Sequence, residues 1–167
     1  MAPQNLFDRI SDVTGKLVAW FTLAMVLVTT IIVVLRYVFD AGFIWMQESV
    51  TWMHAVVFMV GAAYTLQQEE HVRVDVFYRT MDPKRRAWVD ATGVVVFIWP
   101  LCLFLAWKSY DFVTASWGLR EASRESGGLP YPMVPLLKTV LLVMPVAVAL
   151  QGASLFMRSI NALRGRD

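Results

Sequence analysis

Four long apolar runs constrain this sequence more than any other feature. They cover residues 17–35, 43–66, 91–107 and 139–157. A helix of about 20 apolar residues, rising about 1.5 Å per residue, crosses the ~30 Å hydrocarbon core of a bilayer. The helices of a soluble bundle would instead each need a polar face, and these runs contain almost no polar residues. The runs therefore predict an all-α integral membrane bundle of four transmembrane helices.

We expect the whole chain, residues 1–167, to form a single membrane domain. The expected helices cover about residues 17–38, 43–68, 83–117 and 133–158, with a charged cytoplasmic loop at about 69–82 and a periplasmic loop at about 118–132. Asp82 is a candidate N-cap for the third helix, and Pro83 suits its first position. Pro100 and Pro145 fall inside the third and fourth helices, where a missing N–H is expected to kink them.

Lysine and arginine residues indicate how the helices are oriented. Most of them lie in the N-terminal segment, in the loop between the second and third helices, and in the C-terminal segment. The opposite side of the membrane holds fewer, namely Arg36, Lys108, Arg120 and Arg124. The positive-inside rule therefore predicts that the N-terminus and the C-terminus are both cytoplasmic.

The N-terminal segment carries apolar residues at helical spacing, at positions 6, 10, 13 and 17. It either lies along the inner membrane surface or extends the first helix. The first apolar run is longer than the about 7–15 residues typical of a signal peptide, so we expect it to be retained.

Composition excludes several classes of function. The single cysteine, Cys102, excludes an internal disulfide and the paired cysteines of a membrane thiol oxidoreductase. The net charge is only +2 and the basic residues flank apolar runs, so we expect no nucleic-acid partner. The sequence has no glycine-rich phosphate loop, no nucleophile–base pair and no paired carboxylates at helical spacing within the membrane. We therefore predict a protein that is not an enzyme and has no cofactor or metal site.

Arg36 and Glu48 lie on opposite arms of the first hairpin, each six positions from Gly42. Equal arms place the two charges at the same depth, and an unpaired charge there is costly. We therefore expect an ion pair or a shared polar cluster. A structural clasp between the first two helices is preferred over a contact used by a ligand or partner.

Four other residues are candidates for structural or partner contacts. A haem between helices needs a second axial ligand, but His71 falls in the cytoplasmic loop, so His54 is interpreted as a hydrogen-bonded packing residue. His71 and Asp75 are four positions apart, but two ligands do not make a metal site, and a loop-ordering contact or docking surface is favoured. Lys138, near the outer end of the last helix, is interpreted as extending to the interface rather than binding a substrate anion.

Several short motifs follow one another in a defined order. They are Arg36-Tyr37-Val38-Phe39, Trp45, Glu48, Gly61-Ala62-Ala63-Tyr64, His71-Val72-Arg73-Val74-Asp75 and Leu129-Pro130. Over about residues 6–160 this order resembles the small permease subunit of TRAP (tripartite ATP-independent periplasmic) transporters, the DctQ family.

The resemblance implies a small transmembrane subunit of a secondary transporter that takes up organic acids across the bacterial inner membrane, typically by sodium symport. In this family a large DctM-type membrane subunit carries the substrate and sodium sites and moves. The present chain would then be a fixed scaffold that also helps to dock a periplasmic DctP-type substrate-binding protein. Arg36 and Glu48 would hold the periplasmic hairpin, and membrane lipids are further expected partners.

Two other functions remain open from the residues alone. A haem-bearing membrane anchor of a respiratory enzyme requires two histidines at matched membrane depth, and the sequence offers His54 only. A self-sufficient small exporter, dimeric around Glu48, would transport without any other subunit.

Overall fold

A computed structural model describes residues 6–67 and 81–164 of the chain. Its elements are α1 (Leu6–Val38), α2 (Ile44–Gln67), α4 (Pro83–Gly93), the π-helix η1 (Val94–Ile98), α5 (Trp99–Gly118) and α6 (Met133–Leu163). Within these ranges there are no strands, and four segments are long and apolar enough to cross a membrane: Val18–Val38, Ile44–Leu66, Pro83–Gly118 and Met133–Leu163. The predicted all-α membrane protein of four transmembrane helices is confirmed, whereas the cytoplasmic location of the termini stays a prediction.

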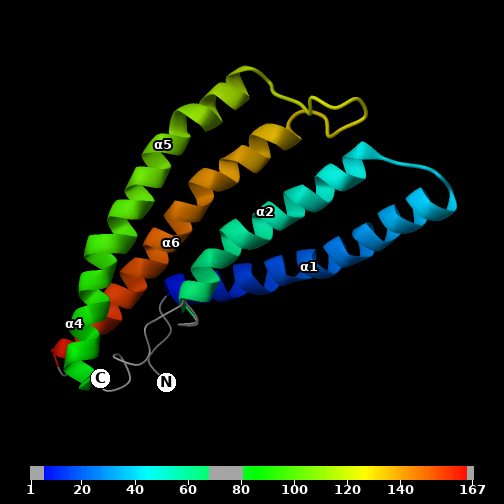
Figure 1. Cartoon of the computed structure of the whole chain (residues 1–167). Coiled ribbons are helices and arrows are strands. Elements are labelled where there is room, and N and C mark those ends of the chain that lie inside the picture. The colour runs from blue at the N-terminus through cyan, green and yellow to red at the C-terminus, as the bar shows by residue number, and fades with distance from the viewer. Residues whose placement is uncertain (1–5, 68–80, 165–167) are drawn as a thin grey trace.

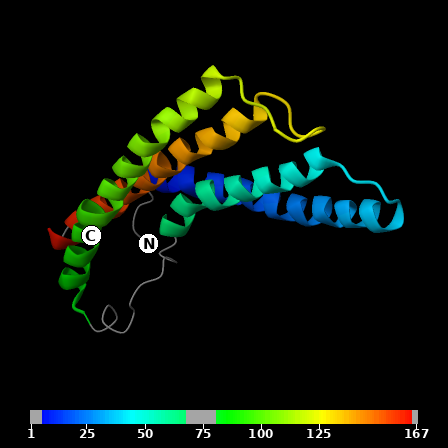
Figure 2. The same cartoon turned by 45° about the horizontal axis from the view of Figure 1, so that its top comes forward.

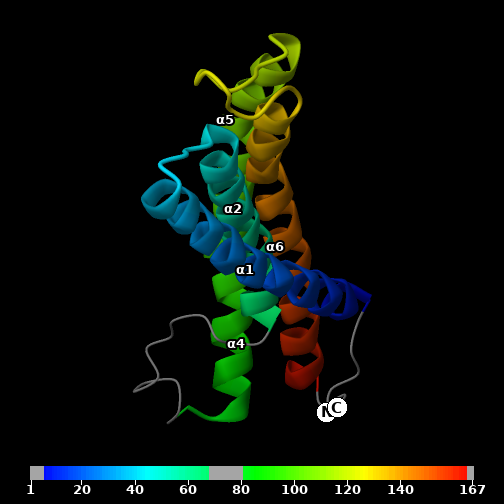
Figure 3. The same cartoon turned by 90° about the vertical axis from the view of Figure 1, so that its right-hand side faces the viewer.

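The four spans form an open array in which α6 is central. It packs against α2 on one side and against α4, η1 and α5 on the other, while α1 packs mainly against α2. Figure 1 shows α5 and α6 running side by side along their length. Figure 3 shows α1 steeply inclined to them and crossing α6. The helices therefore resemble a splayed fan more than a closed four-helix bundle.

The α1–α2 and α5–α6 pairs diverge toward one end of the molecule (Figure 2). That end carries two connections, residues 39–43 and residues 119–132. The second connection, hereafter loop 119–132, reaches the start of α2, where the backbone N–H of Trp45 donates to the carbonyl of Gly127 at 3.2 Å. The loop therefore joins two helix pairs that their own packing leaves apart.

The buried apolar core is small and lies near the opposite end. Leu66, Val94 and Leu155 form its centre, where the end of α2, η1 and α6 meet. Much of the remaining apolar surface is exposed, for example Phe97 and Leu103. Exposed apolar surface on this scale is expected of a protein that lipid or another membrane subunit covers.

The termini of the helices follow local sequence signals. The predicted N-cap is confirmed at α4: the Asp82 carboxylate accepts from the N–H of Lys84, and Pro83 occupies the first turn. Pro100 lacks the N–H that would bond four residues back, and the turn directly before it is the π-helix η1. At the N-terminus, α1 is one continuous helix from Leu6, so the segment before the first span extends that helix.

Candidate functional site at loop 119–132

Loop 119–132 is held in shape by its own hydrogen bonds. Ser123 donates its N–H to the carbonyl of Leu129 at 3.1 Å, and Gly128 donates to Glu125 at 3.0 Å. Gly127 takes a positive φ of 80°, a conformation that glycine adopts without steric cost. The loop is therefore an ordered turn.

The Glu48 carboxylate is the point where this loop meets α2. Glu48 is half-buried, the Ser123 hydroxyl donates to its Oε1, and the backbone N–H of Leu129 donates to its Oε2 at 2.6 Å. Hydrogen bonds to an ionised carboxylate are stronger than those between neutral groups. The side chain thus fixes both arms of the loop against the first turns of α2.

Gly128 leaves the space that this contact needs. A Cβ atom at Gly128 would lie 2.2 Å from the Ser123 Oγ and 2.8 Å from the Glu48 Oε2. Any larger residue would therefore displace the hydroxyl and the carboxylate from each other. We call Glu48, Ser123, Gly128 and Leu129 the loop clasp.

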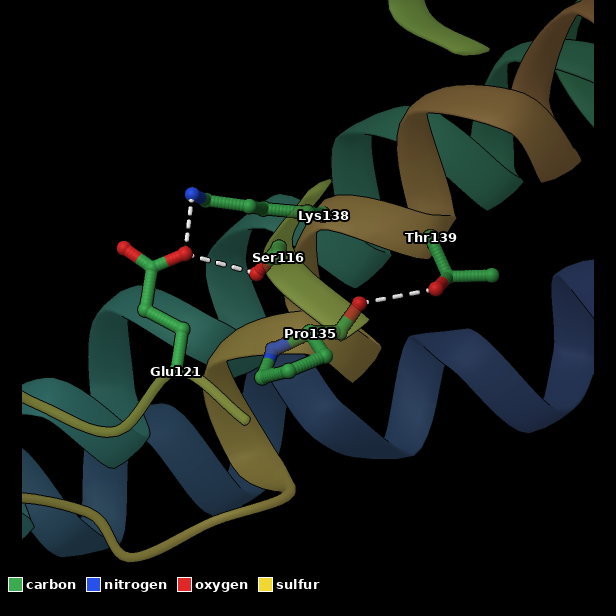
Figure 4. Close-up of polar contacts among 5 residues, drawn as sticks. All are labelled: Ser116, Glu121, Pro135, Lys138 and Thr139. Atoms are coloured by element: carbon green, nitrogen blue, oxygen red, sulfur yellow. Dashed lines mark hydrogen bonds and ion pairs between the residues drawn. The ribbon is translucent and has the colours of Figure 1, made fainter. Parts of the chain in front are cut away.

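A second polar cluster joins α5, the loop and α6 (Figure 4). Lys138 Nζ donates to Glu121 Oε2 at 2.5 Å, and the buried Ser116 hydroxyl donates to the same oxygen at 2.7 Å. Figure 4 shows both side chains directed at this one oxygen. These donors, Lys138 first, lower the pKa of the Glu121 carboxyl below its ordinary value of 4.5. The ammonium of Lys138 also lies 4.1 Å from the ring centroid of Phe112, within cation–π distance.

Two tryptophan N–H groups extend these connections. Trp117 donates from Nε1 to the hydroxyl of Thr139 at 2.9 Å, which joins α5 to α6. Trp52 donates from Nε1 to the carbonyl of Met133 at 3.2 Å, which joins α2 to α6. Three helices and the loop are therefore linked by hydrogen bonds at this end.

The expected contact between Arg36 and Glu48 is not formed. Arg36 is exposed on the last turn of α1, and the partners of Glu48 are Ser123 and Leu129. The reason is geometric, because α1 and α2 diverge toward the 39–43 connection while loop 119–132 reaches Glu48 (Figure 1). Glu48 does hold a clasp, but between α2 and the loop.

The structure places the remaining candidates in different regions. His54 is exposed on α2, with its ring 4.5 Å from that of Phe58. His71 and Asp75 lie outside the described residues. Lys138 has a specific partner, Glu121, which the sequence interpretation missed; both residues flank the same loop, and that proximity was the available signal. In the described ranges no group of three or more metal-ligating side chains occurs.

Comparison with known proteins gives two matches. A family model for the DctQ component of tripartite ATP-independent periplasmic transporters matches residues 25–163, which include the loop clasp and the Glu121–Lys138 pair. The C4-dicarboxylate TRAP transporter small permease protein DctQ of Vibrio cholerae serotype O1 is similar, with 34% identity over 77 residues. That alignment covers 44% of the present chain and 33% of the relative, so it spans about a third of the relative's length.

Proposed function

Since the chain belongs to the DctQ family of tripartite ATP-independent periplasmic (TRAP) transporter components, we propose that it is the stationary scaffold of a transporter that takes up organic acids. The protein is a multi-pass inner membrane protein and a subunit of a TRAP transporter, hence a transporter component and not an enzyme. The scaffold role, the substrate class and the partners are the proposed part.

The loop clasp is the observation that supports a stationary role. Glu48 accepts hydrogen bonds from both arms of loop 119–132, and in the second polar cluster Glu121 accepts from Lys138 and Ser116. These contacts hold α2, α5 and α6 at a set separation. A subunit that moved its helices apart during transport would break them in each cycle, whereas a scaffold keeps them throughout.

The proposed partners are a large DctM-type membrane subunit and a periplasmic DctP-type substrate-binding protein. On this proposal the large subunit carries the substrate and sodium sites, and uptake is sodium-coupled. The relative from Vibrio cholerae is named for C4-dicarboxylates, which supports an organic acid as the substrate class. Loop 119–132 is an ordered, exposed surface suited to help dock the binding protein, with Arg120, Arg124 and Ser126 exposed on it. Membrane lipids fill the remaining contacts.

The experiment is a pull-down of this chain from its native membranes in mild detergent, with mass spectrometry and a visible absorption spectrum on the same sample. The expected result is recovery of a larger multi-helix membrane protein without a haem band. Recovery of haem with a soluble dehydrogenase would overturn the proposal and indicate a respiratory anchor. Recovery of the chain alone as a stable dimer would instead favour the small exporter.

A further inference from the structure

We propose that the α1–α2 face centred on His54 is the surface against which a transmembrane helix of the large membrane subunit packs. We further propose that this helix supplies a hydrogen-bonding group at the depth of His54. The inference rests on the proposed function and adds to it which face of the chain meets the partner.

His54 is the first observation. It lies ten positions after Ile44, about 15 Å along α2 and therefore close to the middle of the Ile44–Leu66 span. The imidazole is exposed, and its ring lies 4.5 Å from the Phe58 ring at a tilt of 45°. It has no hydrogen-bond partner among the residues that the structure describes. An imidazole at that depth is costly against lipid, because acyl chains offer neither a donor nor an acceptor.

The polar surface continues along α2 on the same side. Gln47, Thr51, His54, Phe58 and Gly61 recur at intervals of three or four residues, so they share one helix face. Gln47, Thr51 and His54 are all exposed, and the Thr51 hydroxyl donates back to the carbonyl of Gln47 at 3.3 Å. An exposed polar stripe within a membrane span is typical of a helix–helix contact surface.

Two grooves extend this surface onto α1. One, of about 440 Å³, follows a single face of α1 and includes Thr29 and Thr30. The other, of about 620 Å³, lies between α1 and α2 and includes Phe58 and Gly61. Thr22 lines both grooves, so they form one continuous surface. Small and β-branched side chains at these positions allow the backbone of another helix to approach closely.

The outer face of η1 and α5 has a different character. Its exposed side chains include Val96 and Phe97 of η1 and Leu101, Leu103 and Phe104 of α5. The indole N–H of the nearby Trp99 is already donated to the carbonyl of Ala149. This face suits acyl chains. The α1–α2 face carries polar groups that acyl chains cannot hydrogen-bond. We therefore infer that a protein helix covers it rather than lipid.

The test is photo-crosslinking in the assembled transporter, with p-benzoylphenylalanine in place of one residue at a time. Phe58 and Phe97 are matched sites, because both are phenylalanines in a span and are 66% and 71% exposed. Position 58 is expected to crosslink to the co-expressed large subunit, and position 97 is expected to yield lipid adducts only. Equal crosslinking from both, large-subunit crosslinks from position 97 alone, or a homodimer crosslinked through position 58 would each overturn the assignment.

Co-purification of the large subunit with the wild-type chain separates the two proposals. If the large subunit does not co-purify at all, the proposed function fails. If it co-purifies but crosslinks only through position 97, the function stands and the α1–α2 face is the wrong surface.

A substitution series tests the polar contact itself. His54→Leu is expected to lower recovery of the large subunit roughly 3-fold to 20-fold, the range that one interhelical hydrogen bond in a membrane supplies. His54→Gln retains a donor and an acceptor and is expected to recover most of the loss. Phe97→Leu is the control and should have no effect. Full recovery with His54→Leu would refute the contact.

Discussion

Glu48 receives hydrogen bonds from two residues that lie on opposite arms of loop 119–132. One donor is a hydroxyl, on Ser123, and the other is the backbone N–H of Leu129. Both donors are uncharged, so the contact forms without a lysine or an arginine. At the residue scale, this contact makes the loop part of the folded helix array.

Glu48→Gln should therefore lower the stability of the protein while leaving the transport activity of the assembled complex largely unchanged. A glutamine carbonyl can still accept from the Leu129 N–H, and its NH₂ group can donate to the Ser123 hydroxyl, but both contacts become weaker hydrogen bonds between neutral groups. The melting temperature of the detergent-purified protein should fall by a few degrees, and the yield of complex should fall with it. Turnover per assembled complex should stay near the wild-type value.

The matched control is Glu125→Gln, because Glu125 is an exposed carboxylate of the same loop. Glu125→Gln should leave both the melting temperature and the yield of complex unchanged. Full yield of the Glu48→Gln complex with no transport would contradict the structural role and make Glu48 part of the transport mechanism.

Glu121 makes the stability of its cluster with Lys138 and Ser116 depend on pH. Its pKa is lowered by hydrogen bonds from Lys138 and Ser116, so the folded protein favours the ionised carboxylate more than the unfolded chain does. The associated stability is present above the ordinary pKa of 4.5 and is lost as the pH falls through the lower folded-state value.

We therefore expect the melting temperature of the wild type to fall further between pH 6 and pH 3 than that of Glu121→Gln. The measurement is a pH series of thermal unfolding on both proteins in the same detergent. Parallel curves for the two proteins would show that the Glu121–Lys138 contact contributes no stability.

At the element scale, α1 and α2 pack most closely near the N-terminal half of α1. A Cβ atom at Gly15 would lie 2.3 Å from the Tyr64 ring, so the glycine allows the ring to lie directly against the α1 backbone. At their other end the same helices diverge and are joined only by residues 39–43 (Figure 1). The crossing of α1 over α2 is therefore set at Gly15.

Gly15→Ala should destabilise the protein by about 1–3 kcal/mol, the usual cost of an overpacked contact. Adding Tyr64→Ala should remove the clash and make Gly15→Ala neutral in that background. Gly93→Ala is the control, because a Cβ atom there meets no atom within 4 Å. Thermal unfolding of the four variants measures the coupling, and equal effects of Gly15→Ala with and without Tyr64 would contradict the contact.

At the scale of the whole molecule, the four spans do not enclose a large core. The buried apolar cluster around Leu66, Val94 and Leu155 occupies one end, and loop 119–132 holds the other. Between these ends the helices present wide apolar and polar faces to their surroundings. Such a shape is suited to a subunit that lies beside a larger membrane protein.

Orientation in the membrane is the prediction that belongs to this scale. In a Cys102→Ala background, Ser126→Cys should react with a membrane-impermeant maleimide in intact cells, because loop 119–132 is expected to be periplasmic. Lys84→Cys, at the exposed start of α4, should react only after the cells are opened. The reverse pattern of labelling would invert the topology and place loop 119–132 away from the substrate-binding protein.

The spans, the helical class and the N-cap at Asp82 were accessible from the sequence, because each depends on residues that are neighbours along the chain. Apolar run length determines whether a helix can cross a bilayer, and a cap needs only the residues beside it. The order of motifs from Arg36 to Pro130 likewise indicated the DctQ family, which the family match confirmed.

Only the tertiary structure decided which groups contact Glu48. Counting positions from Gly42 placed Arg36 and Glu48 at equal depth, but depth says nothing about how far two helices diverge. The donors to Glu48 lie 75 and 81 positions away in the sequence, on a loop whose shape depends on its own hydrogen bonds. Contacts of that range follow from how helices pack and loops fold back, and no local pattern of residues encodes them.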